Sequence, residues 1–525
     1  MLRTRTLDAL WIAGILALFC LHFPHLLADF PNHSPWMADY AKYTDEGWYA
    51  NAAVRFHLTG HWYLPGDFNP AVALPVWPAL LAVLFHFTGV SLAAARAVGL
   101  IVLGLNLVLS FCVLRVCASH RIALLALTLL VSSPFLYAFS RLALLEPLLI
   151  APLLLSWLLA LHLPRATAAS RVVLLAATGL LFCLMVLTKT TAVFLIPSTL
   201  FLIARAFGFR LAAARALALV LIAAALPWSA WFFLFVNPRY RADYNYLFAA
   251  NQWPQPTTFT GWFAAFWYAL HGALWISPTL ALTALALLAL ALLPSRSAPP
   301  VESRSPVFVR NPLVPASLLV AAGYIFFAGW HNNPQPRYYQ IVIYPLAFIL
   351  VLAAADLLRH SRPLPLRIAG AASVVIMAAV SLAGARTMAG YIRHPDYSFL
   401  SAARSIAAII DRTPGHPRRL LSVSADQIAL VTALPALDDD YGAWDLPYRI
   451  HVYDPGWFAA WNEIDPGTLD ALDALDARYS LVPIAQFPAF DDPDRNLLVL
   501  YRLDPLPAAR RDEDAPRESR ARAAR

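Results

Sequence analysis

The chain has 525 residues, of which 60% are hydrophobic and only 13% are charged. Soluble domains carry about 25% charged residues, so this composition excludes an ordinary soluble enzyme and indicates a polytopic membrane protein. The formal net charge is +8, but residues 1–390 hold 24 basic against 10 acidic side chains, and residues 391–505 hold 9 against 17. A basic membrane part therefore precedes an acidic part, and neither resembles a nucleic-acid-binding surface.

The first of these parts contains many apolar segments. A helix needs about 20 mostly apolar residues to cross a bilayer, and eleven segments meet that requirement: 7–28, 92–117, 121–139, 142–162, 171–188, 190–207, 211–236, 275–294, 312–330, 338–358 and 366–387. The stretch 71–88 is apolar too, but Pro75 and Pro78 interrupt it. It fits an interfacial or re-entrant helix, or a twelfth span. We therefore expect about eleven transmembrane helices in residues 1–390.

Arginine placement indicates the orientation of these spans. If Arg3 and Arg5 lie in the cytoplasm and the spans alternate, every later cytoplasmic connection is basic, as the positive-inside rule requires. A full crossing by 71–88 would invert this agreement. We therefore expect a multi-pass protein of the cell (inner) membrane with a cytoplasmic N-terminus and two long outer loops, 29–91 and 237–274. The second outer loop is rich in tryptophan and phenylalanine, which favours a helix lying in the membrane interface.

Residues 391–505 have a different pattern. Helical apolar spacing is found in 396–415, which ends at Pro-Gly, and in 466–479, whereas 418–424, 448–453, 479–483 and 496–502 are typical of strands. This predicts a small soluble α/β domain outside the membrane. The tail, 506–525, is rich in charged residues and proline and is expected to be disordered.

The first outer loop contains two adjacent carboxylates, Asp45 and Glu46, in "YTDEGWYANAA" (43–53). They begin an amphipathic helix that also carries Tyr49. In one interpretation Thr44 or Asp45 caps this helix and Glu46 interacts favourably with the helix dipole. In the other, the carboxylates serve as a general base or bind a metal ion or a sugar hydroxyl.

Two charged residues interrupt apolar runs near the outer face. Glu146 lies in "SRLALLEPLL" (140–149), where an acid at the bilayer centre would cost about 2.5–3.5 kcal/mol. It could form a structural pair with Arg141 or act on a substrate. Lys189, one of only two lysines in the chain, joins two spans on the outer side. It could snorkel to the interface or bind an anion.

A third cation precedes a late span in "HNNPQPRYYQIVIYPLAF" (331–348), where Arg337 is followed by Tyr338 and Tyr339. These residues could form an interfacial anchor, or the guanidinium could bind a phosphate. Carboxylates from two places and cations from three are thus expected on one membrane face. Such a set fits a lipid-linked phosphosugar whose head group lies just outside the bilayer.

Several motifs resemble those of the GT-C membrane glycosyltransferases, in particular the protein-O-mannosyltransferase-like and aminoarabinose-transferase-like family with its galacturonosyltransferase-like bacterial members. The motifs are the Asp-Glu pair before "WYA", "TGVSLAAARAVGLIVLGL" (88–105), "SRLALLEP" (140–147), "LTKTT" (187–191) and the Arg-Tyr start of "RYYQIVIYPLAFILVLAAA" (337–355). The resemblance covers about residues 1–360. The chain departs from the family in having no Pro-Pro in 66–78 and in having Glu146 where many members have aspartate.

The resemblance implies a GT-C-like fold and a transferase that takes a sugar from a polyprenyl-phosphate donor to an envelope lipid, glycan or protein. It implies that Asp45 is the essential acid, supported by Glu46, and that Glu146 is the second acid. Lys189 and Arg337 would contact the donor phosphate together with Arg141, and Tyr49, Tyr338 and Tyr339 would line the substrate site. The use of a divalent metal, with Asp45 and Glu146 as ligands, stays open. No nucleic-acid partner is expected.

Two other functions fit the same residues. Charged groups inside membrane segments also mark the substrate path of transporters and flippases, but those proteins bind near the midplane and often contain repeated halves. No internal repeat is visible in the sequence. A non-catalytic component that recognises a lipid carrier is the other alternative.

Overall fold

The computed structural model describes residues 2–64, 70–250, 255–293, 307–359, 361–438, 446–463, 466–492 and 495–507. The chain divides into two compact units: Met1–Leu26, Val72–Trp77 and Ala93–Pro395 form the first, and Leu27–Ala71, Pro78–Leu92 and Asp396–Arg525 form the second. The start of the predicted first outer loop thus groups with the C-terminal segment, whereas the sequence pattern assigned it to the membrane part. The predicted disordered tail lies outside the described residues from residue 508 onward.

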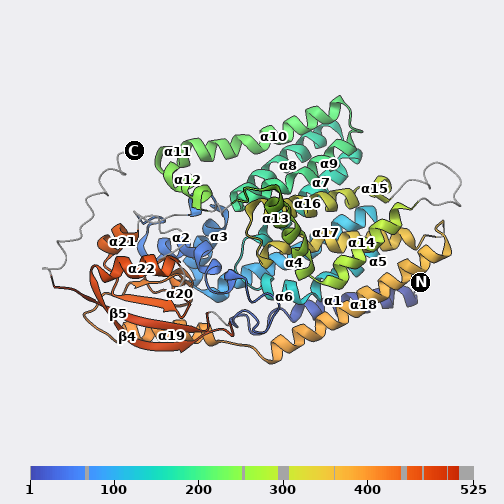
Figure 1. The fold of residues 1–525 in the computed structure, drawn as a ribbon. Helices are drawn as coiled ribbons and strands as arrows, with labels where there is room; N and C mark the ends of the chain where they lie inside the picture. Colours follow the sequence, from blue (N-terminus) through green and yellow to red (C-terminus); the bar gives the residue numbers. More distant parts are fainter. Residues whose placement is uncertain are drawn as a thin grey trace. The chain divides into compact units, whose positions relative to one another are not determined.

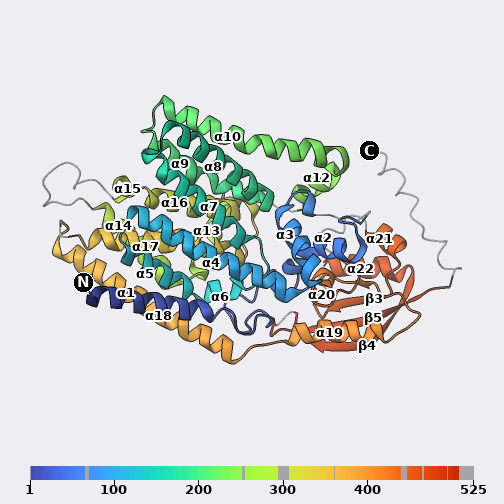
Figure 2. The same cartoon turned by 180° about the vertical axis from the view of Figure 1, so that it is seen from behind.

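The first unit is a helical bundle in which α7, α8, α9 and α10 lie side by side (Figures 1 and 2). Its helices of ten or more residues are α1 (Leu2–Cys20), α4 (Leu92–Cys117), α5 (His120–Val131), α7 (Glu146–His162), α8 (Ala168–Thr188), α9 (Ile196–Ala206), α10 (Leu211–Trp231), α12 (Arg241–Ala250), α13 (Phe259–His271), α14 (Pro278–Leu292), α16 (Leu313–His331), α17 (Ile343–Leu357) and α18 (Leu364–Arg393). The shorter ones are α6 (Pro134–Ser140), α11 (Asn237–Arg239) and α15 (Val307–Arg310), and η8 (Pro336–Gln340) is a 3₁₀ turn.

Among the described residues, seven helices are long and apolar enough to cross a membrane, or up to nine if each of two bent pairs forms one span. The chain is therefore a multi-pass membrane protein, but the count of eleven is not confirmed. The predicted spans 7–28 and 190–207 correspond to shorter apolar helices, Thr6–Cys20 and Thr190–Ala206. The stretch 71–88 forms α3 (Val76–Thr88), whose 13 residues are typical of a re-entrant or interfacial segment.

The predicted span 121–139 is broken, because α5 and α6 meet at an angle of 63°. Pro134 begins α6, and its ring nitrogen has no hydrogen with which to continue the hydrogen bonding of α5. The side chain of Ser133 instead accepts a hydrogen bond from the backbone N–H of Leu136, which caps the new helix. The expected span therefore consists of two helices that change direction at a Ser-Ser-Pro sequence.

The aromatic residues of the second outer loop lie on α13 and are divided between its two sides. Phe263 and Trp267 are exposed and stack on each other with ring centroids 6.2 Å apart. Phe266 packs against Phe326 of α16, with ring centroids 5.3 Å apart. An exposed aromatic face opposite an anchored one is the pattern expected for a helix lying in the membrane interface.

Arginines predicted to be cytoplasmic gather around one buried carboxylate. Asp356, near the end of α17, forms ion pairs with Arg310 (2.6 Å), Arg362 (2.5 Å) and Arg359 (3.5 Å). Arg362 also donates to the carbonyl oxygens of Ala291 and Leu293. This cluster ties the ends of three helices together and compensates the burial of Asp356.

The second unit contains a five-stranded sheet with the order β2-β1-β3-β5-β4. Its strands are β1 (Leu420–Leu421), β2 (Ala436–Leu437), β3 (Trp457–Trp461), β4 (Tyr479–Pro488) and β5 (Leu497–Pro505). The strand β1 pairs in parallel with β2 and β3, and β5 pairs antiparallel with β3 and β4. Its helices are α2 (Asp45–Thr59), α19 (Ser398–Asp411), α20 (Ala425–Thr432), α21 (Leu446–Tyr453) and α22 (Pro466–Asp476). Separate apolar clusters form around α19 and around α21 with α22.

The small α/β region is confirmed, but one predicted strand is wrong. Residues 448–453 lie in α21, in which Leu446, Arg449 and Ile450 are buried. Their spacing of three and four residues follows one face of a helix, so the helical period outweighs the local alternation of "YRIHVY". The strand β3, in "WFAAW", was not predicted because its residues are almost all apolar and do not alternate.

Helix α2 of the predicted first loop packs directly on α20 of the C-terminal segment. Gly47 is the point of closest approach, since a Cβ at this position would lie 2.1 Å from the backbone nitrogen of Gln427. The Gly47 N–H donates to Gln427 Oε1 at 2.6 Å, and Gln427 Nε2 donates to Glu46 Oε2 at 3.1 Å. One turn further along α2, Asn51 donates to Asp426 at 2.7 Å.

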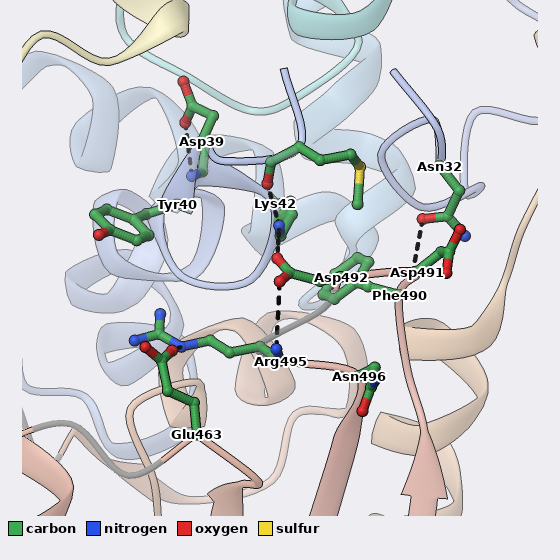
Figure 3. Close-up of polar contacts among 12 residues, drawn as sticks. Asn32, Asp39, Tyr40, Lys42, Glu463, Phe490, Asp491, Asp492, Arg495 and Asn496 are labelled. Carbon is green, nitrogen blue, oxygen red and sulfur yellow. Dashed lines mark hydrogen bonds and ion pairs between the residues drawn. The ribbon is translucent and has the colours of Figure 1, made fainter. Parts of the chain in front are cut away.

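A second set of contacts joins the segment before α2 to the connection between β4 and β5. Lys42 donates to the carbonyl oxygen of Met37 and forms an ion pair with Asp492, as Figure 3 shows. The guanidinium of Arg495 lies 4.8 Å from the centre of the Tyr43 ring and pairs with Glu463 at 2.5 Å. Burial lowers the pKa of Arg495 from its usual value.

We predict that Gly47→Ala destabilises the second unit, because the added methyl group must push α2 away from the backbone of α20. Overpacking of this kind costs about 1–3 kcal/mol or more. The matched control is Gly390→Ala, another helical glycine, where a Cβ meets nothing within 4 Å. Limited proteolysis and thermal unfolding of the purified protein in detergent would measure the difference. Equal behaviour of the two variants would contradict the close packing of α2 on α20.

Candidate functional site

Glu146 and Lys189 form a buried ion pair between the start of α7 and the end of α8. Glu146 is the first residue of α7 and is fully buried, with Pro147 directly after it. Its carboxylate therefore lies at the positive end of the helix dipole. Lys189 is the residue at which α8 ends; it has an extended backbone and its Nζ contacts Glu146 Oε1. The sequence identified both residues as charges that interrupt apolar runs, and the structure shows that they contact each other.

Two cations flank the ring of Tyr338. Lys189 Nζ lies 4.8 Å from the ring centre, and the guanidinium carbon of Arg337 lies 4.9 Å from it. The 3₁₀ turn η8 presents Arg337 and Tyr338 consecutively, after Pro336 fixes its first residue. His331, at the end of α16, stacks on Phe327, which in turn meets the edge of Tyr338. Glu146, Lys189, Arg337 and Tyr338 are called the cationic cluster below.

The cationic cluster carries more positive than negative charge, with two cations against one carboxylate. All four residues are at most 8% exposed, so water screens these charges poorly. Glu146 Oε2 has no hydrogen-bond partner among the described residues. The cluster can therefore bind an anion that approaches Lys189 and Arg337, or a donor group that approaches Glu146.

The alternative pairing of Glu146 with Arg141 is wrong, because Lys189 is the ion-pair partner of Glu146 within the described residues. Arg141 donates to the carbonyl oxygens of Pro24 (2.8 Å) and His25, and its guanidinium lies 4.6 Å from the centre of the Tyr137 ring. These contacts indicate that Arg141 holds the segment after α1 in place.

Tyr339 faces a different element from its neighbour Tyr338. Its hydroxyl donates to the carbonyl oxygen of Ala269 in α13, and its ring meets Trp275 edge-on with centroids 5.3 Å apart. A Cβ on Gly272 would lie 2.1 Å from this ring. Tyr339 therefore anchors the end of α13 against η8.

The two carboxylates of the first loop have different environments in the second unit. Glu46 is fully buried and held by Gln427, whereas Asp45 is partly exposed and accepts a hydrogen bond from Thr44 at 3.2 Å. Thr44 precedes α2 but makes no side-chain capping bond to it. Tyr49 is 9% exposed and packs edge-on against Trp48. Asp45 is therefore the less buried of the two residues, although its Oδ2 atom is itself buried.

The structure thus places the predicted residues in two groups. The cationic cluster belongs to the first unit, and Asp45, Glu46 and Tyr49 belong to the second. The convergence of the two groups on one substrate stays a prediction. A metal site was left open, and within the described ranges no three histidine, cysteine or acidic side chains gather to form one.

Some polar residues were missed by the sequence analysis. Gln340 is 1% exposed and neither its Oε1 nor its Nε2 has a partner among the described residues. Tyr324 of α16 is 1% exposed, and its hydroxyl lies 3.3 Å from the hydroxyl of Thr191, within hydrogen-bond distance. Gln340 directly follows the Arg-Tyr-Tyr motif, and this position could have identified it as a candidate site residue. No local signal distinguishes Gln427, since its role depends on a contact with a residue about 380 positions earlier.

Comparisons with known proteins find similarity in structure but not in sequence. No protein-family model and no curated protein matches the chain. ArnT from Cupriavidus metallidurans in its apo state superimposes with a TM-score of 0.63 at 16% identity, covering 95% of this chain and 98% of that one. The same protein bound to undecaprenyl phosphate matches equally well, over 94% and 98%. The Archaeoglobus fulgidus oligosaccharyltransferase matches with a TM-score of 0.51 at 11% identity, covering 93% and 76%.

At these identities the similarity establishes the fold, and it extends over almost the whole chain, including the C-terminal sheet. The fold predicted from the motifs is confirmed: this multi-pass membrane chain has the GT-C fold of the glycosyltransferases it resembles.

Proposed function

We propose that the chain is a membrane glycosyltransferase that moves a sugar from a polyprenyl-phosphate donor to an envelope lipid, glycan or protein at the outer face of the cell (inner) membrane. The observation that carries this proposal is the buried pair of cations flanking Tyr338. It occurs in a fold shared with ArnT, whose structure has been solved with undecaprenyl phosphate. The N-terminus is cytoplasmic and the C-terminal domain lies outside in this proposal.

Lys189 and Arg337 bind the phosphate of the donor. A guanidinium offers two parallel N–H groups to phosphate oxygens, and an ammonium adds a compact charge. When the bond between the anomeric carbon and the phosphate oxygen breaks, that oxygen keeps the electron pair. The cations then stabilise the negative charge that grows on the leaving polyprenyl phosphate. Glu146 holds Lys189 in position.

Asp45 acts as the general base. It accepts the proton of the acceptor hydroxyl as the hydroxyl oxygen forms a bond to the anomeric carbon. Glu46 has a positioning role, because its buried carboxylate is already held by Gln427. The C-terminal domain holds α2, and with it Asp45, through contacts from α20 and from the connection between β4 and β5.

The direct test is transfer by the purified full chain of radiolabelled sugar from a panel of undecaprenyl-phosphate hexoses and pentoses to envelope extract. Mass spectrometry of envelope glycans and glycoproteins, with and without the gene product, would identify the modified acceptor. Movement of intact donor across vesicle membranes without transfer would instead support a flippase.

We predict that Asp45→Asn lowers transfer by about 10²–10⁴-fold, the usual contribution of a general base. Binding of undecaprenyl phosphate should be unchanged, since the phosphate contacts are elsewhere. Asp411→Asn is the control, because Asp411 is an exposed carboxylate of the same unit that pairs with Arg418. Transfer assays with the two purified variants measure the difference, and full activity of Asp45→Asn would rule out its role as base.

We predict that Lys189→Met weakens undecaprenyl phosphate binding about tenfold to a hundredfold, because it removes a charged hydrogen-bond donor worth about 1.5–3 kcal/mol. Titration of the detergent-purified protein with undecaprenyl phosphate measures this affinity. The control is Lys42→Met, the only other lysine, whose partner is Asp492 in the second unit. Equal phosphate affinity of both variants would contradict a phosphate site at the cationic cluster.

A further inference from the structure

A cavity of about 510 Å³ lies between α13 and the turn that follows α16. Its volume is within the range of small-molecule sites, about 300–1,000 Å³. The wall from the turn contains three amide side chains, Asn332, Asn333 and Gln335, together with Pro334. The wall from α13 includes Ala264 and Tyr268. None of the residues that line this cavity is charged.

The cavity contains a buried hydrogen-bond acceptor without a partner. Gln335 is 8% exposed, and its Nε2 donates to Asn333 Oδ1 at 2.7 Å. The other amide atom, Gln335 Oε1, has no partner among the described residues. A buried acceptor left unpaired costs free energy, and a ligand hydroxyl would relieve that cost.

The walls of the cavity are fixed by tight contacts on both sides. A Cβ on Gly329 would lie 2.4 Å from the Phe266 ring, so α16 and α13 approach closely below the cavity. One turn further along α13, Tyr339 donates to the carbonyl oxygen of Ala269. Asn332 ends α16 in the left-handed conformation, with φ of 55°, which turns the chain toward Gln335. The amides are therefore preorganised.

We propose that this cavity binds the sugar ring of the lipid-linked donor, an inference that rests on the proposed function. A neutral site with amide and phenol groups suits the hydroxyls of a sugar and offers nothing to a phosphate. Gln335 and Arg337 are two residues apart, so their Cα atoms are at most about 7 Å from each other. A sugar in the cavity can therefore be joined directly to a phosphate at the cationic cluster, as in a polyprenyl phosphosugar.

The test compares two probes, undecaprenyl phosphate and the tightest-binding undecaprenyl-phosphate hexose or pentose of a panel, on the detergent-purified full chain. Gln335→Met keeps the side-chain length but removes the acceptor. It should weaken binding of the glycosylated probe about tenfold and leave the affinity for undecaprenyl phosphate within about twofold. Ala264→Leu fills the cavity from the opposite, exposed wall and should give the same selective loss with Gln335 intact.

Three outcomes would overturn the inference. Equal loss for both probes would place Gln335 at the phosphate, and no loss for either would leave the cavity without a role in donor binding. A change confined to the KM of the acceptor would assign the cavity to an acceptor sugar. Absence of transfer and of any selective binding by the unmodified chain would instead refute the proposed function itself, so the two failures are distinguishable.

Discussion

An ionised carboxylate buried at the end of a membrane helix needs a compensating charge close to it, and Lys189 supplies that charge to Glu146. Removing one partner of such a pair typically costs about 3–5 kcal/mol, because the remaining charge is left uncompensated. The pair joins the start of α7 to the end of α8, two helices that pack along each other. The ion pair therefore compensates both charges and also fixes the position of the Lys189 ammonium group.

The contribution of Arg337 follows from this arrangement. The pair alone is neutral, and its attraction for an anion would be weak. Arg337 adds the excess charge, and the ring of Tyr338 attracts both cations, which lie 4.8 and 4.9 Å from its centre. Tyr339, the next residue, anchors α13 instead. Two adjacent tyrosines thus serve separate purposes, one in the cationic cluster and one in anchoring α13.

The sequence made it possible to identify charged residues that are unusual for the segments in which they occur. Glu146 and Lys189 interrupt apolar runs, and Arg337 falls in a connection predicted to lie on the outer side, where arginines are scarce. Such residues require a physical reason, and that requirement identified them. Arg141, five residues before Glu146, was the only partner that the local sequence suggested for it. The pairing with Lys189 depends on how α7 and α8 pack, so it was not predicted. Contacts between Glu46 and Gln427 were beyond prediction, since they depend on how segments distant in sequence pack. The helix at 448–453 was missed because six residues fit either period.

The division of roles between Asp45 and Glu46 follows from burial. A general base must be reached by the proton it accepts, and a fully buried carboxylate that already accepts a hydrogen bond is poorly placed for that. Glu46 is such a group, whereas Asp45 stands one residue earlier, at the start of α2, and is partly exposed. Gln427 and Asp426 hold the helix by backbone and side-chain contacts that do not involve Asp45. Asp45 accepts its own hydrogen bond from Thr44, and the contacts of α2 with α20 fix the position of the helix that carries it.

The charge of the cationic cluster also suits the direction of the proposed reaction. A polyprenyl phosphosugar carries one negative charge, whereas the polyprenyl phosphate released from it carries about 1.5–2 at neutral pH. Lys189 and Arg337 therefore interact more strongly with the leaving group than with the donor. An interaction that strengthens along the reaction lowers its barrier, and one that is equally strong throughout does not. A neutral sugar site beside the cluster would complement this, because it positions the ring without adding charge that opposes bond cleavage.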